Sequence, residues 1–249
     1  MVRLLSYNIR KAVGLDWRRD PFRIAHVLHD SGADIVALQE ADKRLGPRPA
    51  ALPREAIDAS GLAPVLTGDG PSLGWHGNAV LVRPDWPARV VDRLPLPGVE
   101  PRGALIVRID TADGPLTLCA THMGLLRVSR LSQMAAIAAA LEEAGPGVVI
   151  AGDMNEWSRR IGFEPWTERL ALLDPGPSFH ASRPIAHLDR FLVGPAWRAE
   201  GCGVMRTALT ARASDHLPVW AELAPVQDRS LNASASMRMK AAPSLPTGT

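Results

Sequence analysis

Four short apolar runs of this chain end in acid, amide or imidazole groups, and a fifth run begins with such groups. The four are residues 4–8, 34–40, 116–122 and 148–155, and the fifth follows Ser214-Asp215-His216. A buried carboxylate or imidazole must be paired, so buried strands rarely end in such groups by chance. Several strand ends that converge on one site are how α/β enzymes build active sites. The pattern therefore predicts one site at a common sheet edge.

The first part of the chain predicts a strand, a helix and a second strand. Residues 2–9 favour a strand. Asp20 and Pro21 then favour a helix start, as N-cap and first helical residue, and Gly32 favours the helix end. Residues 34–40 have almost no polar interruption, which indicates a strand buried on both faces. If the two strands pair through a right-handed crossover, both ends lie at the same edge.

The middle of the chain predicts strands in direct succession. A short helix is expected first, over residues 53–60, and Gly61 ends it. Four strand candidates follow, over residues 78–83, 88–94, 103–110 and 116–122, and Asp113-Gly114 suits a hairpin turn before the last of them. Because no helix separates these strands, the pattern favours antiparallel pairing.

The second half mixes helices and strands. The clearest helix spans residues 129–143, with an expected apolar face made by Leu131, Met134, Ala135, Ala138 and Leu141. Strands over residues 148–153, 188–193, 203–209 and 217–223 complete the pattern. Hairpins mixed with crossover helices predict an α/β fold of two stacked mixed, mainly antiparallel sheets with helices outside.

The composition is that of one large globular domain. The chain has 249 residues, 46% of them hydrophobic, which supports a sizeable core over residues 1–225. Beyond Pro225 the sequence turns to Ser, Ala, Met and Pro without periodicity, so we expect residues 226–249 to form a disordered tail. No apolar stretch reaches about 18 residues, so a membrane span is not expected, and a cytoplasmic location is the default.

Charge and cysteine usage narrow the classes of function. The formal net charge is +2, which implies no strong field for polyanions, and the Arg residues are scattered where a nucleic-acid coat would cluster them. Neither of the two cysteines belongs to a CxxC motif, and Cys119 is expected to be a small buried apolar residue. No protein partner can be inferred from the sequence.

Glu40 and Asn8 end the two strands that the expected crossover brings to one edge. A surface acid at a strand end is common, so Glu40 alone leaves that interpretation open. Together, a carboxylate and an amide oxygen suit Mg²⁺ or its first water shell. The two residues therefore indicate a site for a hard metal ion.

Two further strand ends and one strand start carry candidates for acid–base chemistry. Asp153 and Asn155 are two residues apart and share a face in extended backbone, although an Asx-type turn is the alternative. His122 ends another strand, where a structural role is the commoner one. Asp189 begins an apolar strand and needs a partner, for which His216 is the obvious candidate. A carboxylate that holds an imidazole in one tautomer is a standard acid–base arrangement.

These motifs, in this order, resemble the endonuclease/exonuclease/phosphatase superfamily. They are Tyr-Asn, Gln-Glu, Thr-His, Gly-Asp-x-Asn, Leu-Asp and Ser-Asp-His, and the resemblance spans Leu4 to Leu223. Each motif is short, but the ordered combination is highly specific. The superfamily includes pancreatic-type deoxyribonucleases, abasic-site endonucleases, neutral sphingomyelinases and inositol-polyphosphate 5-phosphatases. The resemblance implies a four-layer α/β/β/α sandwich and Mg²⁺-dependent cleavage of phosphate esters, with Mn²⁺ as a possible substitute.

The resemblance also implies how the metal ion and the attacking water are held. Glu40 would be the principal metal ligand, assisted by Asn8, and Asp215 would lie close to the metal. Asp153 would orient or deprotonate the attacking water, and Asn155 would bind the phosphoryl group.

The histidines take the remaining roles that the resemblance implies. His216, paired with Asp189, would be the second acid–base or phosphate-stabilising group. His122 would hydrogen-bond a phosphate oxygen. Members of the superfamily are interpreted differently on whether the acid or the histidine is the base, so the choice between Asp153 and His216 stays open here.

The sequence says least about how the substrate is recognised. The chain looks like small bacterial members of uncertain substrate, but Arg10 stands where His is expected and His180 where Pro is expected. Asn78 and Arg102 are plausible phosphate contacts, although Asn78 could equally be a turn residue and Arg102 part of a structural pair. Together with Arg10 they are the candidate substrate-binding residues.

The first functional hypothesis is a Mg²⁺-dependent phosphodiesterase that acts as a nuclease. The second is a phosphoesterase for a lipid or inositol phosphate, which the lack of a basic lipid-binding helix disfavours. The third is a catalytically inactive binding module on the same fold. Every expected catalytic residue type is present, which ranks that hypothesis last.

Overall fold

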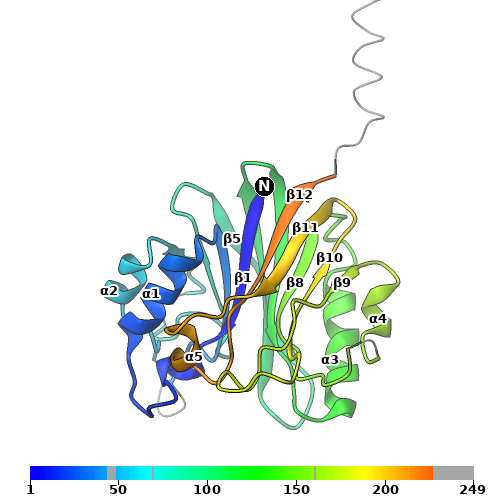
Figure 1. Cartoon of the computed structure of the whole chain (residues 1–249). Helices are drawn as coiled ribbons and strands as arrows, with labels where there is room; N and C mark the ends of the chain where they lie inside the picture. The colour runs from blue at the N-terminus through cyan, green and yellow to red at the C-terminus, as the bar shows by residue number, and fades with distance from the viewer. Residues whose placement is uncertain (44–48, 69, 160, 227–249) are drawn as a thin grey trace, which may run out of the picture.

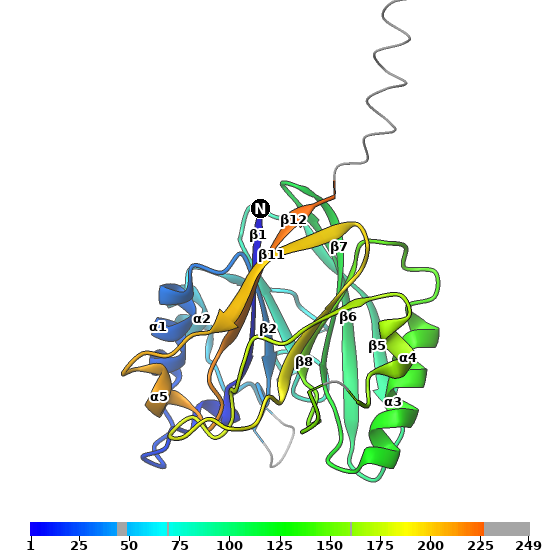
Figure 2. The same ribbon diagram turned by 45° about the vertical axis from the view of Figure 1, so that its right-hand side comes forward.

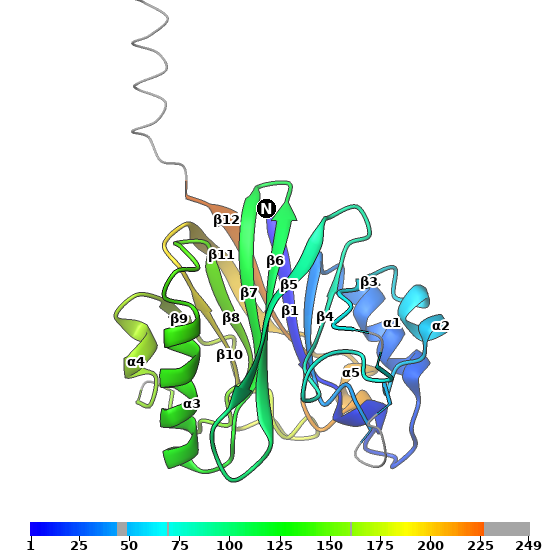
Figure 3. The same cartoon turned by 180° about the vertical axis from the view of Figure 1, so that it is seen from behind.

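Two six-stranded sheets stack face to face, and helices cover both outer faces (Figure 1). This computed structural model describes residues 1–43, 49–68, 70–159 and 161–226. Seen from behind, α1 and α2 lie outside one sheet, and α3 and α4 lie outside the other (Figure 3). The predicted four-layer sandwich of mixed sheets is confirmed.

The first sheet has the strand order β11-β12-β1-β2-β4-β3. Its strands are β1 (Val2–Asn8), β2 (Ile35–Gln39), β3 (Ala63–Pro64), β4 (Ala79–Val82), β11 (Trp197–Val204) and β12 (Val219–Pro225). β1 and β2 pair in parallel through α1 (Pro21–Ser31), with Asn8 opposite Gln39. The Asp20 side chain caps α1 by accepting from the Arg23 N–H, and Gly32 ends it with a left-handed φ of 61°.

The second sheet has the order β5-β6-β7-β8-β10-β9. Its strands are β5 (Ala88–Leu96), β6 (Arg102–Thr111), β7 (Gly114–His122), β8 (Val148–Asp153), β9 (Ala171–Leu173) and β10 (Asp189–Val193). β7 and β8 pair in parallel, and α3 (Arg127–Ala140) connects them. β10 runs antiparallel to β8 with Asp189 directly opposite Asp153. The ends of β7 and β8 and the start of β10 therefore lie at one edge.

The remaining helices are short. They are a 3₁₀ turn (η1, Arg10–Ala12), α2 (Arg54–Ala59), α4 (Glu164–Thr167) and α5 (Thr210–Ala213). Figure 2 shows α5 on the same side of the molecule as α1, while α4 lies beside α3. None of the described helices combines the length and the apolar character that crossing a membrane requires.

Strand alternation divides the core into three apolar layers. Along β1, Val2 and Leu4 face the other sheet, whereas Leu5 and Tyr7 pack in the cluster beneath α1. A third cluster fills the space under α3, around Ile137. The same period of two places Asn8 on the inner face with Leu4. Side chains that end the strands on their inner faces therefore point toward the seam between the sheets.

Three expectations about elements were wrong. The strand expected over 203–209 is β11, which ends at Val204, after which the chain leaves the sheet for α5. Successive strands β4 and β5 do not pair, because β4 lies between β2 and β3 in the first sheet. The expected apolar face of α3 is also rotated, since Leu131 is exposed and the buried residues include Gln133 and Ile137.

Polar contacts explain the orientation of α3. Gln133 accepts a hydrogen bond from the Gly124 N–H at 2.8 Å and donates to the Pro97 carbonyl at 2.9 Å. Arg130, also buried, contacts Glu156 Oε2 at 2.7 Å. Buried polar groups must find partners, so these contacts outweigh the apolar pattern. Cys119 is buried as expected, whereas the expected disordered tail, apart from Val226, lies outside the described residues.

Candidate active site

Asp153 lies at the centre of a buried polar cluster at the seam between the sheets. The Asn8 side-chain amide donates to its Oδ2 at 3.0 Å. Nε2 of His122 lies 3.3 Å from the same oxygen, and Nε2 of His216 lies 3.6 Å from it. β1, β7 and the segment before β12 therefore each contribute one group that contacts the carboxylate at the end of β8.

Asp189 holds His216 from the other side of the ring. Nδ1 of His216 lies 2.9 Å from Asp189 Oδ2, and the Ser178 hydroxyl donates to the same oxygen. The Phe179 ring lies 4.9 Å from the His216 ring and covers it. The structure thus forms the Asp–His pair that the sequence indicates, with one ring nitrogen toward Asp189 and the other toward Asp153.

The charge of His216 follows from these two carboxylates. Burial by itself lowers the pKa of this imidazole, but the charges of Asp189 and Asp153 outweigh burial and raise its pKa to about 9. His216 is therefore an imidazolium at neutral pH.

His122 has the opposite protonation state. Burial lowers its pKa to about 3, and the nearby Arg102 charge adds to this against the opposing effect of Asp153. His122 is therefore a neutral ring at neutral pH, so the cluster around Asp153 contains one charged and one neutral imidazole.

Glu40 and Lys11 lie at the junction of two open cavities beside this cluster. The Lys11 ammonium forms an ion pair with Glu40 Oε2. One cavity, of about 320 Å³, is lined by both residues together with His122 and Arg102. The second, of about 350 Å³, is lined by both residues together with Arg10, Val13, Trp17 and Asp215. Glu40 therefore faces both cavities.

Backbone strain is concentrated at the same place. Glu40 has a φ of 52°, and the three residues of η1 have φ values between 47° and 60°, all in the left-handed region although none is glycine. Asn155 has a φ of 50°. Such conformations cost on the order of 1 kcal/mol or more each, and they gather where a site needs a particular geometry. Lys11, the middle residue of the left-handed turn η1, forms the ion pair with Glu40.

The other residues predicted from the sequence differ in how close they lie to the two cavities and to Asp153. Asp215 Oδ2 lies 3.5 Å from Nε of Arg10, at the second cavity. Asn155 donates its side-chain N–H to the Met123 carbonyl at 2.9 Å. Asn78 is fully buried and donates to the Gly103 carbonyl at 2.9 Å. Arg102 lines the first cavity with Glu40. The geometry thus brings all but Asn78 to a cavity or to the loops around Asp153.

Sequence reasoning missed Lys11, Ser178 and Phe179. No local pattern marks them, because Lys11 reaches Glu40 only through the left-handed turn, and Ser178 reaches Asp189 from a loop. The alternation of β8 and β10 was an available signal. Asp153 is four residues from Val149, and Asp189 is two residues from Phe191, and both apolar residues lie on the inner faces of their strands. Because side chains alternate with a period of two, both acids could have been placed at the seam.

The described residues offer two places for a metal ion. The first is Glu40 and Asp215, which line one cavity, with Asn8 at the end of the strand paired beside Glu40; oxygens of this kind match the ligand preference of Mg²⁺. The Lys11 ammonium on Glu40 shows that this carboxylate attracts a cation. The second is Asp153, Asp189 and His216, whose ligand atoms all lie within 4.8 Å of one another. In this second group, Nε2 of His216 faces Asp153 and its Nδ1 faces Asp189.

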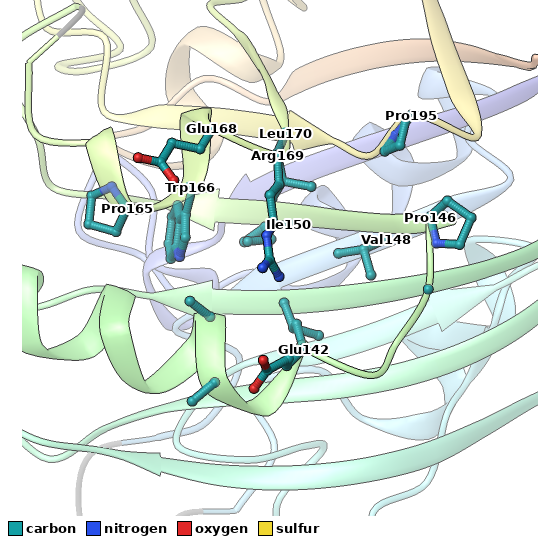
Figure 4. A pocket seen from close by; sticks show the side chains of 14 residues that line it. Glu142, Pro146, Val148, Ile150, Pro165, Trp166, Glu168, Arg169, Leu170 and Pro195 are labelled. Carbon is teal, nitrogen blue, oxygen red and sulfur yellow. The ribbon is translucent and has the colours of Figure 1, made fainter.

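A larger cavity, of about 650 Å³, lies elsewhere (Figure 4). It is bounded by α3, α4 and the beginning of β8, where Val148 and Ile150 line it near Trp166. Val148 is at the opposite end of β8 from Asp153, roughly 17 Å away along an extended strand. The cavity is largely apolar, and the polar cluster of Asp153 is remote from it. Size alone therefore does not identify the site of chemistry.

Comparison with known proteins agrees with the fold. The sequence profile of the Endonuclease/Exonuclease/phosphatase family matches residues 5–216. An endonuclease/exonuclease/phosphatase from Beutenbergia cavernae is 24% identical, with a TM-score of 0.67 over 90% of this chain and 71% of that chain. A mannosyl-6-phosphatase from Bacteroides thetaiotaomicron is 20% identical, with a TM-score of 0.66 over 90% and 99%.

A third similar structure is a nucleic-acid complex. It is D. rerio TDP2 with a single-stranded DNA product, 15% identical, with a TM-score of 0.65 over 89% of this chain and 98% of that chain. All three structures are less than 25% identical, so they show a shared fold. No curated protein matches the sequence.

Proposed function

The chain belongs to the endonuclease/exonuclease/phosphatase family, whose members hydrolyse phosphate esters, and we propose that it is a divalent-metal-dependent phosphodiesterase acting as a nuclease. The observation that carries this proposal is the contact of one buried carboxylate, Asp153, with Asn8, His122 and His216. Phosphoryl transfer needs an in-line nucleophile and neutralisation of charge on the phosphoryl oxygens. The cluster offers a base, an imidazolium and a neutral imidazole for these tasks.

Asp153 is the better base of the two candidates. His216 carries a proton at neutral pH because Asp189 and Asp153 raise its pKa to about 9, so it is not free to accept another. Asp153 accepts hydrogen bonds and can take the proton of a water that attacks phosphorus. As the bond from phosphorus to the leaving oxygen breaks, the His216 imidazolium stabilises the negative charge or donates its proton. His122 is neutral and has one ring N–H, so its Nε2 would exchange the contact with Asp153 for a hydrogen bond to a phosphoryl oxygen when substrate binds.

Glu40, Asn8 and Asp215 would hold a divalent ion. Mg²⁺ or Mn²⁺ bound there would neutralise charge on the phosphate. The chain itself supplies the orientation, because the left-handed backbone at Glu40 directs its carboxylate toward both cavities.

A diester is the preferred substrate on grounds of charge. The sequence suggests one metal ion, one histidine and amide donors, which can balance a diester monoanion. One observation favours a second candidate, a phosphomonoesterase. Arg10, Lys11 and Arg102 line the cavities that Glu40 faces, so the site has one cationic group, Lys11, beyond the two arginines that the sequence indicates. A similar structure is named a mannosyl-6-phosphatase.

The test compares bis(p-nitrophenyl) phosphate with p-nitrophenyl phosphate, each with Mg²⁺ or Mn²⁺ and with excess chelator. We expect faster cleavage of the diester, loss of activity in chelator, and recovery when the metal is restored. Glu40→Gln should raise the metal concentration needed for half activity, whereas Glu143→Gln, at an exposed position of the surface, is the matched control.

Two outcomes would contradict the proposal. Full activity after exhaustive chelation would show that catalysis does not require a metal ion. The protein could also release inorganic phosphate from monoesters efficiently and act on no diester. That result would contradict the nuclease proposal and support a phosphatase.

A further inference from the structure

Trp17 is an exposed aromatic side chain beside the candidate active site. It retains 78% of its accessible surface, and it lines the 350 Å³ cavity together with Glu40 and Asp215. This volume lies within the range of small-molecule sites. An occupant of the cavity would therefore lie among the indole and the candidate metal ligands. A single exposed aromatic needs no explanation by itself, so the case depends on how this one is held.

The loop that carries Trp17 is braced from several sides. Arg23 contacts both carboxylate oxygens of Asp16, at 2.8 and 3.2 Å, and donates to the Arg18 carbonyl at 2.8 Å. The Leu15 N–H donates to the Arg212 carbonyl at 3.0 Å. These contacts tie the loop to α1 and α5, so the loop is fixed before any ligand binds.

Close packing and backbone strain at the loop support the same conclusion. A Cβ at Gly14 would lie 2.3 Å from Nη2 of Arg23 and 2.6 Å from the Arg212 carbonyl oxygen, so only glycine fits there. Trp17 itself has a φ of 61°, an unfavourable conformation for a bulky residue. Strain of this kind persists where the surroundings over-determine the geometry. The loop therefore holds an apolar ring exposed to solvent in a strained conformation.

Arg10 links the indole to the polar cluster. Its guanidinium carbon lies 4.6 Å from the centre of the Trp17 ring, and its Nε lies 3.5 Å from Asp215 Oδ2. One cation therefore stacks on the indole and contacts a carboxylate of the candidate metal site. Flat π surfaces of this kind bind planar groups by stacking. A lipid chain would require an apolar enclosure, but the other residues lining the cavity are charged except for Val13.

We infer that Trp17, supported by Arg10, is a stacking platform for a nucleobase attached to the phosphate that reacts beside Glu40. This inference rests on the proposed function and narrows it, because the substrate would be a nucleotide-containing phosphodiester. The polar edges of a base suit the charged walls of the cavity, and its ring suits the indole. Trp17 would contribute to substrate affinity, with little effect on the chemical step.

The test measures binding of adenosine 5′-monophosphate and ribose 5-phosphate by calorimetry, with the full chain and Mg²⁺. The two probes share a sugar and a phosphate, so a difference in affinity reports the base alone. We expect adenosine 5′-monophosphate to bind about 5- to 150-fold more tightly than ribose 5-phosphate, which is the range that about 1–3 kcal/mol of stacking for one base implies. Trp17→Ala should abolish the difference, and Trp17→Phe should keep most of it. Trp157→Ala is the matched control, because Trp157 is 63% exposed and is not among the residues lining this cavity.

Three results would overturn the inference. The first is equal affinity of the wild type for the two probes, including no measurable binding of either. The second is a base preference that survives in Trp17→Ala. The third is an equal loss of affinity for both probes in Trp17→Ala, which would indicate that the indole contacts the sugar and not the base. Cleavage of bis(p-nitrophenyl) phosphate is measured alongside, so a wild type that cleaves it without base preference refutes the platform and leaves the phosphodiesterase standing.

Discussion

Replacement of Asp189 by Asn tests the origin of the charge on His216. Asp189 Oδ2 lies 2.9 Å from Nδ1 of His216, and among the effects that raise the pKa of this imidazole its charge is the largest. The rise from 6.5 to about 9 corresponds to roughly 3 kcal/mol in favour of the imidazolium in the folded state. Since burial opposes this rise, loss of Asp189 should lower the pKa of His216 well below its wild-type value.

The same shift predicts how stability depends on pH. A histidine whose pKa is raised by folding contributes stability that is fully present below its unfolded pKa of about 6.5. That contribution is lost as the pH rises through about 9. The difference in unfolding free energy between wild type and Asp189→Asn should therefore be largest, up to about 3 kcal/mol, near pH 6. It should shrink toward pH 10.

The assay is a histidine NMR titration combined with denaturant unfolding across this pH range. The spectrum of His216→Gln assigns the resonance. Asp174→Asn is the matched control, because Asp174 lies 2.6 Å from Nδ1 of another histidine, His187. It should leave the titration of His216 unchanged. A pKa of His216 within about half a unit of wild type in Asp189→Asn, or a stability difference that does not vary with pH, would refute the reasoning.

Three further predictions address the catalytic cluster, the metal site and the C-terminal segment. Asp153→Asn and His216→Ala should each lower turnover by about 10² or more while the fold persists; near-normal turnover of the folded variants would show that neither is catalytic. Lys11→Met removes the cation paired with Glu40, so Mg²⁺ should bind about fivefold more tightly in calorimetry without substrate, as the loss of a competing ion pair of about 1 kcal/mol implies. Weaker binding of Mg²⁺ would mean that Lys11 does not compete with the metal. Truncation after Val226 should leave the melting temperature and turnover nearly unchanged, because residues 227–249 have little apolar content; a large loss of either would show that the segment docks on the domain.

Much of the fold follows from local patterns in the sequence. The ends of α1 were predictable because an Asp that caps a helix and a Gly that ends one act through the nearest residues. The buried run of β2 and the hairpin of β6 and β7 were predictable for the same reason. Predictions failed where distant contacts decide, as in α3, whose face is turned by the hydrogen bonds of Gln133 to Pro97 and Gly124.

Residue types at the strand ends also indicated the candidate site. Asn8, His122 and Asp153 end three strands. Parallel pairing brings His122 and Asp153 together in the second sheet, whereas Asn8 ends a strand of the first sheet and meets Asp153 only where the two sheets stack. The partition of strands between the sheets was not predictable, because β4 and β5 are neighbours in sequence and belong to different sheets. Pairing of strands is set by which apolar faces can be buried together, and this depends on the whole chain.

By itself the sequence determined which groups are available for chemistry and that they lie at strand ends, because alternation and capping are local properties of the backbone. Only the tertiary structure decided the state of these groups. His216 is charged because it is buried between Asp189 and Asp153, and Glu40 is paired because a left-handed turn brings Lys11 to it. Charge and desolvation depend on three-dimensional distance, and distances between residues far apart in sequence are fixed only when the two sheets pack.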